Sequence, residues 1–238
     1  MEKISKKDFI EIEYTGKLKE ENLVFDTTDE KVAKENNLES HAGYEPVIIC
    51  VGEEQLLKGI DKNLEGKETG KEYDIELKPE DAFGNKNAKL IQLVPTAKFK
   101  QQNIQPMPGM QLNIDGVVGT IKTVSGGRTL VDFNHPLAGK ELSYKIKINK
   151  KITDDKEKLS GYLKLSLGTK DFEAEITNDT GTKSGIPQGD TNSVGNAKVS
   201  LKKDIPGEVK EKLIEKITEL IPNIKKVEFT VNNNEKNK

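Results

Sequence analysis

The sequence has no tryptophan and a single cysteine, Cys50. One cysteine cannot form an intrachain disulfide, so a disulfide framework is excluded and a reducing, cytoplasmic location is expected. No window approaches the run of about 18 apolar residues that a membrane span needs. The N-terminal residues 1–14 also lack the apolar stretch of a secretion signal. We therefore expect neither a membrane association nor a signal peptide.

An excess of charge of one sign is also absent. The 238 residues include 38 Lys and Arg and 40 Asp and Glu, which are interspersed and give a formal net charge of −2. Because there is no basic stripe, we expect no nucleic-acid partner. Hydrophobic residues make up 33% of the chain and aromatic residues 5%, which favours several small domains over one large core.

Common catalytic and metal-binding patterns are missing as well. The two histidines, His41 and His135, lie far apart, and no Cys/His cluster or Gly-rich phosphate loop is present. We therefore expect no metal and no cofactor. We interpret His135, next to Pro136, as a hydrogen-bonding residue at a chain junction, and His41 and Cys50 as structural residues.

Residues 8–84 show the pattern of an antiparallel sheet with one helix packed against it. Residues 8–18 alternate, with Ile10, Ile12 and Tyr14 on one face. Apolar residues at helical spacing predict a helix over 53–66 that ends at Gly66. Further strands are predicted at 22–28, 46–52 and 71–77, with a short helix at 29–36. Strands with a single helix indicate an α+β arrangement.

Residues 88–133 show a different pattern of apolar residues. Asp115-Gly116 and Ser125-Gly126-Gly127 are hairpin signals between short apolar runs. Strands are predicted at 89–94, 110–114, 117–124 and 128–133, with a short helix after Pro95-Thr96. About 45 residues make a marginal domain, so this β-rich module is expected to depend on its host. The strand-like run at 131–150 stops at Pro136 and resumes at 142–148.

The last third predicts a small α+β domain with the order strand, strand, helix, strand. Strands are predicted at 162–168, 172–177 and 226–231, and a frayed tail at 232–238. The Gly/Thr/Asn-rich loop 178–196 has a length that indicates flexibility or function. A helix at 207–221 is expected to pack on its own sheet, with a dimer seam as the alternative. Its apolar stripe comprises Val209, Leu213, Ile217, Leu220 and Ile221.

Five motifs in order resemble the FKBP-type peptidyl-prolyl isomerases, in particular the long SlyD-like and archaeal members. They are IEYTGKL (12–18), VFDTT (24–28), the run 46–60 with VG and LLKGI, PEDAFG (79–84) and LSYKIKI (142–148). Segment 131–142 resembles the point where such proteins return from a domain inserted in the flap. The resemblance implies an α+β fold in three parts. These are an FKBP-like antiparallel sheet with a short helix (1–87 and 134–152), a small β-rich inserted domain (88–133) and a C-terminal α+β domain (153–238).

The same resemblance implies a proline-binding pocket. Its residues would be Tyr14, Phe25, Asp26, Val47, Ile49, Leu56, Leu57, Ile60, Phe83 and Tyr144. Ile60 stands where many members have tryptophan, and Phe83 where the usual motif has tyrosine, so we expect weaker binding of macrolide inhibitors. Without the resemblance, these apolar residues would be read as ordinary core, and Asp26 as a turn residue.

The resemblance predicts an enzyme, a peptidyl-prolyl cis/trans isomerase whose partners are unfolded or partly folded polypeptides containing proline. A chaperone role is implied for the insert, with client-binding candidates Met107, Met110, Val117, Val118 and Ile121. These side chains could instead form the core of the insert. The C-terminal domain could add client surface, form a homodimer or tether a partner. The alternative function is a non-catalytic holdase that binds apolar segments.

Overall fold

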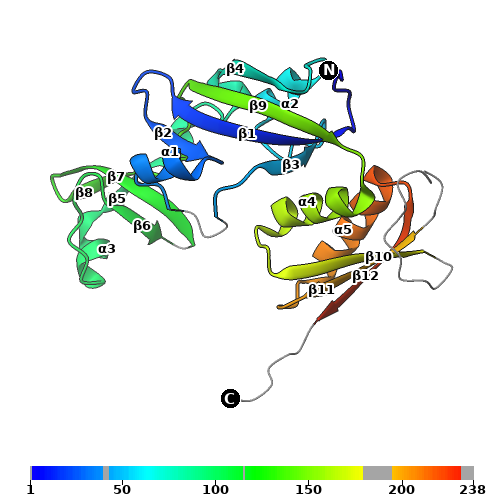
Figure 1. The fold of residues 1–238 in the computed structure, drawn as a ribbon. Coiled ribbons are helices and arrows are strands. Elements are labelled where there is room, and N and C mark those ends of the chain that lie inside the picture. The colour runs from blue at the N-terminus through cyan, green and yellow to red at the C-terminus, as the bar shows by residue number, and fades with distance from the viewer. Residues whose placement is uncertain (1, 40–42, 115, 179–194, 232–238) are drawn as a thin grey trace. The chain divides into compact units, whose positions relative to one another are not determined.

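The computed structural model describes residues 2–39, 43–114, 116–178 and 195–231. They belong to two compact units: the first comprises Met1–Glu76 and Ser143–Lys238, and the second Leu77–Leu142 (Figure 1). The first unit contains the FKBP-like sheet and the C-terminal domain, and the second contains the β-rich insert. The predicted domain boundaries, 88–133 for the insert and 153–238 for the C-terminal domain, are not tested by this division and stay predictions.

The FKBP-like module is built on a five-stranded sheet. Its strands follow the order β2-β1-β9-β4, and β3 pairs with β1. The bounds are β1 Phe9–Leu18, β2 Val24–Thr27, β3 Val47–Cys50, β4 Lys71–Leu77 and β9 Leu142–Ile152. On β9, Leu142, Tyr144, Ile146 and Ile148 are all buried. Because side chains alternate with a period of two, one face of β9 points to the core. After the insert, β9 enters the sheet between β1 and β4.

Two helices accompany this sheet, α1 Glu30–Glu35 and α2 Lys58–Leu64. The helix predicted from residue 53 therefore begins five residues later. Gly52 and Glu54 have φ of 93° and 50°, left-handed values that interrupt a helix. The buried carboxylate of Asp61 accepts hydrogen bonds from the backbone N–H groups of both residues, each at 2.8 Å. The segment before α2 is thus a pinned loop.

The second unit contains a four-stranded antiparallel sheet in the order β5-β8-β7-β6. Its elements are η1 Pro79–Asp81, η2 Ala88–Leu90, β5 Ile91–Pro95, α3 Thr96–Gln101, β6 Gln111–Ile114, β7 Val117–Ser125 and β8 Arg128–Asp132. Both predicted hairpins are confirmed, since β6 pairs with β7 and β7 with β8. Asp115 itself lies outside the described residues. Phe99, Ile121 and Val131 form the buried core.

The C-terminal domain packs two helices with a three-stranded sheet of order β10-β11-β12 (Figure 1). Its elements are α4 Asp155–Leu167, β10 Phe172–Asn178, β11 Gly195–Leu201, α5 Gly207–Leu220 and β12 Ile224–Val231. β10 runs antiparallel to β11, and β11 runs parallel to β12 across the α5 connection. In α5, Leu213, Ile217 and Leu220 are buried, whereas Val209 is 40% exposed.

The strand predicted at 162–168 is wrong, because these residues belong to α4. Leu159, Tyr162 and Leu163 are buried at helical spacing. The Asp154 side chain caps the helix by accepting from the Glu157 N–H at 2.8 Å, and Gly168 ends it at φ 63°. Strand β11 was not predicted. Most of the loop predicted at 178–196, and the whole tail 232–238, lie outside the described residues.

Among the described residues, every helix is too short or too polar to cross a lipid bilayer.

Candidate active site

Three aromatic rings from three strands meet on one side of the FKBP-like sheet. Tyr144 of β9 lies 5.9 Å from Tyr14 of β1, centroid to centroid, with the rings tilted at 56°. Phe25 of β2 meets the same Tyr144 ring edge-on at 5.8 Å. Tyr144 is only 3% exposed, whereas Tyr14 and Phe25 are half-buried. The three rings thus form an apolar cluster with partly open walls.

Gly16, also on β1, makes this cluster possible. A Cβ atom at Gly16 would lie 2.7 Å from Cε1 of Tyr144 and 3.1 Å from Cζ of Phe25. Real side chains do not approach so closely, so only glycine allows both rings to lie against the strand. The register between β1 and β2 shifts between Gly16 and Lys17. The requirement for glycine in the YTG motif is therefore steric.

Asp26 supplies the carboxylate of the cluster. The Tyr14 hydroxyl donates a hydrogen bond to it, and so does the backbone N–H of Thr27. Burial raises the pKa of Asp26 above its ordinary value, although these two hydrogen bonds oppose the rise. Burial, reinforced by the nearby charge of Asp26, also raises the pKa values of Tyr14 and Tyr144. Both phenols therefore stay protonated and available as donors at neutral pH.

Two threonines next to Asp26 fix the backbone of Tyr14. The Oγ1 of Thr28 accepts from the Tyr14 N–H at 2.8 Å, and the Thr28 N–H donates to the Tyr14 carbonyl at 2.9 Å. The Oγ1 of Thr27 donates to the same carbonyl at 3.1 Å and shares a 2.8 Å hydrogen bond with Thr15. The two threonines were not predicted as site residues, although they belong to the VFDTT motif. They position Tyr14 without lining the cluster.

Strand β3 adds an aliphatic wall. Val47 pairs with Ile12 and Ile49 with Ile10, and side chains two apart share one face of a strand. Ile49 is 2% exposed, and Val47 is half-buried. Leu56 and Leu57 follow on the loop before α2 and are both half-buried, and Ile60 within α2 is fully buried.

Phe83 belongs to the second unit and has its own partner there. Its ring stacks on His135 at 4.3 Å between centroids, with 7° between the planes. His135 is exposed, and its Nδ1 accepts from the Leu137 N–H at 3.2 Å. The interpretation of His135 as a hydrogen-bonding residue at the junction is thus confirmed. The ring partnership with Phe83 was not predicted, because 52 residues of sequence separate the two.

The described residues contain no group of three or more His, Cys, Asp or Glu side chains arranged to hold a metal ion. His41 lies outside the described part of the chain. Cys50 is buried and free, and burial together with the Glu53 and Asp61 charges raises the pKa of its thiol to about 12. The thiol is therefore an inert core group rather than a nucleophile.

Comparison with known proteins identifies two parts within residues 1–137. A family model described as FKBP-type peptidyl-prolyl cis-trans isomerase matches residues 1–102. A second, described as FKBP26, IF domain, matches residues 92–137. The insert is thus of a kind found within this family.

Individual relatives agree with the family models. The short-type peptidyl-prolyl cis-trans isomerase of Methanocaldococcus jannaschii is 35% identical over 146 residues, which cover 61% of this chain and 92% of the relative. SlyD of Helicobacter pylori is 31% identical over 47% of this chain and 62% of its own length. The 16 kDa FKBP-type isomerase of Escherichia coli is 30% identical over 43% and 72%. The chain therefore belongs to the FKBP-type peptidyl-prolyl cis-trans isomerases.

Proposed function

We propose that the aromatic cluster and the β3 wall form the pocket in which this enzyme isomerises X-Pro bonds. The observation that carries the proposal is the convergence of Tyr14, Phe25 and Tyr144 on one another, with Asp26 bonded to Tyr14. Apolar and aromatic side chains of this kind are what typically line a site for an apolar ring such as that of proline. In this proposal Val47, Ile49, Leu56, Leu57 and Ile60 complete the pocket.

The chemistry needs no bond-making residue. Rotation about an X-Pro bond has a barrier of about 20 kcal/mol and takes tens of seconds without a catalyst. An acceleration of about 10³- to 10⁵-fold requires roughly 4–7 kcal/mol of preferential binding to the twisted state. The planar amide is the more polar form because resonance places charge on its oxygen. An apolar pocket that excludes water therefore favours the twisted amide.

The polar groups of the site orient the substrate in this proposal. The backbone N–H of Leu57, next to the start of α2, donates to the carbonyl that precedes the proline. Asp26 holds the Tyr14 phenol through their hydrogen bond. The amide nitrogen of the substrate gains electron density as the amide twists and loses resonance. A negative charge beside that nitrogen would disfavour the twisted state, so in this proposal Asp26 acts by orienting Tyr14 and not by contacting the nitrogen.

A peptide isomerisation assay tests this assignment. The Asp26→Ala, Tyr144→Ala double variant is expected to lose at least about tenfold in kcat/KM for a short proline peptide. Tyr73→Phe is the matched control, because the Tyr73 hydroxyl bonds the Glu68 backbone outside the cluster. An unchanged rate in the double variant would show that the pocket lies elsewhere. No acceleration by the wild-type chain would favour the non-catalytic holdase.

We further propose that the insert binds unfolded client segments. A groove of about 550 Å³ opens on it, whose apolar lining comprises Leu90, Val94, Phe99, Ile114, Val117 and Phe133. Apolar side chains exposed by 36–59% also gather on the insert: Leu90, Ile91, Leu93, Met107, Val117 and Val118. So many exposed apolar residues on one small module are typical of a surface that contacts unfolded chains.

This surface differs in part from the one expected from sequence. Ile121 is fully buried in the core of the insert and is not available to a client, whereas Met110 is partly buried against that core. The alternation of Ile121 with outward residues on β7 could not be assigned to a face from sequence alone. Met107, Met110, Val117 and Val118 remain in the proposal, and Leu90 and Leu93 join it.

The client proposal is tested with Leu93→Ser, Val118→Ser, which removes two exposed apolar side chains. We expect weaker suppression of client aggregation and slower refolding of a proline-limited protein, with unchanged turnover of short peptides. Lys100→Ser on α3 is the control, since it alters an exposed polar side chain of the same module. Equal losses in refolding and in peptide turnover would contradict the division of labour.

We also propose that residues 153–238 mediate a homodimer and that the protein is cytoplasmic. Within the described residues, β10 and β12 each pair on one side with β11 and form the two edges of the sheet, and strand edges readily pair with another chain. Light scattering of the full chain over a range of concentrations tests the dimer, and a mass of one chain throughout would contradict it. The free, buried Cys50 is compatible with a reducing compartment.

A further inference from the structure

The C-terminal domain contacts the FKBP-like module at both ends of β3. Before the strand, Glu45 forms ion pairs with Lys164 of α4 and with Lys170, the latter at 2.7 Å. After the strand, Lys216 of α5 donates to Glu53 at 2.8 Å. The two acidic residues that bracket β3 are therefore both held by lysines of the C-terminal domain.

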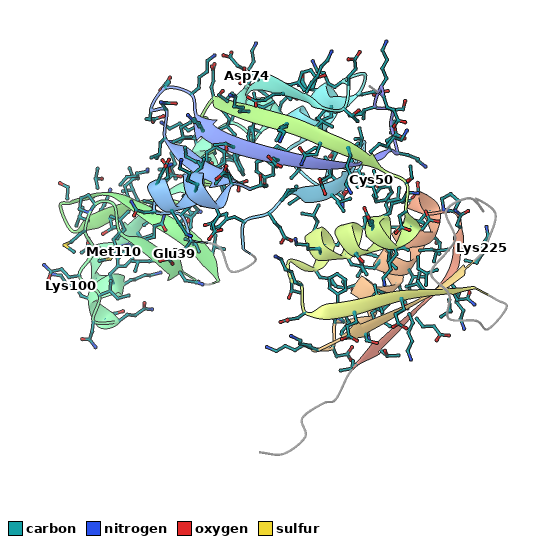
Figure 2. The ribbon with its side chains drawn as sticks, in the orientation of Figure 1. Glu39, Cys50, Asp74, Lys100, Met110 and Lys225 are labelled. Atoms are coloured by element: carbon teal, nitrogen blue, oxygen red, sulfur yellow. The ribbon has the colours of Figure 1, made fainter. Side chains whose placement is uncertain are left out.

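The middle of β3 is held by packing. Its alternation places Val47 and Ile49 toward the proposed pocket and Ile48 and Cys50 on the other face. Ile48 rests on Gly161 of α4, where a Cβ atom would lie 2.5 Å from the Ile48 Cβ. Cys50, labelled in Figure 2, belongs to the buried cluster formed mainly by the C-terminal domain. One strand thus presents one face to the pocket and the other to this domain.

The contact between Lys216 and Glu53 also bears on the residues that follow, because the backbone on either side of Glu53 is held by hydrogen bonds. The N–H groups of Gly52 and Glu54, on either side of Glu53, both donate to the Asp61 carboxylate at 2.8 Å. The Glu53 side chain is 14% exposed, so its position is restricted by its surroundings. The loop leads within four residues to Leu57. A shift of Glu53 would consequently move Leu57.

Lys216 is itself part of a chain of alternating charges. It pairs with Glu53 at 2.8 Å and with Glu219 at 3.3 Å, and Glu219 pairs with Lys7 at 3.0 Å. The hydrogen bonds to Glu53 and Glu219 raise the pKa of Lys216, so it stays charged across the physiological range. One helix of the C-terminal domain therefore holds both the segment before β1 and the loop after β3.

We propose that Lys216 is a positioning residue for prolyl isomerisation: by holding Glu53, it fixes the loop that presents Leu56 and Leu57 to the substrate. The C-terminal domain then acts on the active site of the same chain, in addition to any client binding or dimerisation. The inference rests on the proposed pocket, since Leu56 and Leu57 matter for the rate only if they line it.

Steady-state kinetics on the full chain tests the proposal. Lys216→Met keeps most of the side chain's length but removes the charge, and we expect kcat/KM for a proline peptide to fall about three- to thirtyfold. Lys216→Arg is expected to stay within about twofold of wild type, because the pair can re-form. Lys212→Met, an exposed lysine one turn earlier on α5, is the control for loss of charge on this helix.

The partner is tested through a double-mutant cycle. Glu53→Gln should cost as much activity as Lys216→Met, and the two together no more than either alone, because both remove one contact. The charge swap Glu53→Lys, Lys216→Glu should recover part of the rate. An unchanged kcat/KM in Lys216→Met, or a fall in thermal stability alone, would overturn the proposal. If the wild-type chain is active and the Asp26→Ala, Tyr144→Ala variant loses activity as expected, such a result would contradict only the role of Lys216 and would leave the proposed pocket intact.

Discussion

Gly16 and Tyr144 are in direct contact, and the absence of a side chain at position 16 allows it. A methyl group there would lie 2.7 Å from the Tyr144 ring. We predict that Gly16→Ala displaces Tyr144, lowers kcat/KM about tenfold and costs about 1–3 kcal/mol of stability. Peptide kinetics and urea unfolding measure the two effects. Gly207→Ala, where nothing lies within 4 Å of the new methyl group, is the control and should be close to neutral.

Asp26 predicts a pH dependence of activity. Because burial raises its pKa, Asp26 takes up a proton at a pH above the ordinary value of 3.8, and the protonated acid is a poorer acceptor for the Tyr14 phenol. We expect kcat/KM to fall as the pH is lowered through this raised pKa. Asp26→Asn should abolish that step at a lower, constant activity. A wild-type profile with its step at or below 3.8 would contradict the assignment.

The raised pKa of Asp26 also leads us to expect a pH dependence of the free energy of unfolding. The folded state binds the Asp26 proton more tightly than the unfolded chain does, because the folded pKa is the higher one. The free energy of unfolding should therefore decrease as the pH rises from the ordinary value of 3.8 through the raised pKa. Comparison of wild type with Asp26→Asn by urea titration at several pH values isolates this contribution. A difference that grows in the opposite direction would contradict it.

Ile60 occupies a fully buried position, at 1% exposure, on α2. We predict that Ile60→Ala lowers the free energy of unfolding by about 2–5 kcal/mol, since the lost side chain leaves a cavity that its neighbours fill only in part. Urea denaturation gives the value. Lys62→Ala, an exposed change in the same helix, should stay within about 0.5 kcal/mol of wild type.

A substitution at Asp154 tests helix α4, which the structure shows in place of the strand predicted at 162–168. The Asp154 carboxylate caps α4 through the Glu157 N–H, so Asp154→Ala should destabilise the protein by about 1 kcal/mol. Asp154→Ser should recover most of the loss, because serine also caps helices well. Thermal unfolding of the three proteins measures the differences. Equal stability of all three would show that the cap contributes nothing.

Much of the FKBP-like module follows from local pattern. The period of two in β1 and β9 depends only on which side chains avoid water, and the hairpins of the insert follow from turn glycines that accept positive φ. The pocket residues were named through the resemblance of ordered motifs, and the convergence of Tyr14, Phe25, Asp26 and Tyr144 is a fact of the fold.

Local pattern failed where two periods fit the same residues. Segment 162–168 reads as alternating or as helical, and the choice was made by a cap at Asp154, a stop at Gly168 and the burial of Leu159 and Leu163 at helical spacing. The predicted start of the helix at residue 53 was also wrong, because the Asp61 carboxylate accepts hydrogen bonds from the backbone N–H groups of Gly52 and Glu54 and holds this segment as a loop. Such competing hydrogen bonds are specific to the folded chain.

By itself, the sequence determined the kind of protein: its alternating strands, its turn residues and its ordered motifs depend on neighbours along the chain. Only the tertiary structure decided what Gly16, Ile121 and Lys216 do. Gly16 makes room for a ring from a strand 128 residues away, Ile121 faces the core and not a client, and Lys216 reaches Glu53 across 163 residues. Close packing and ion pairing act on distance in space, which separation along the chain does not reveal.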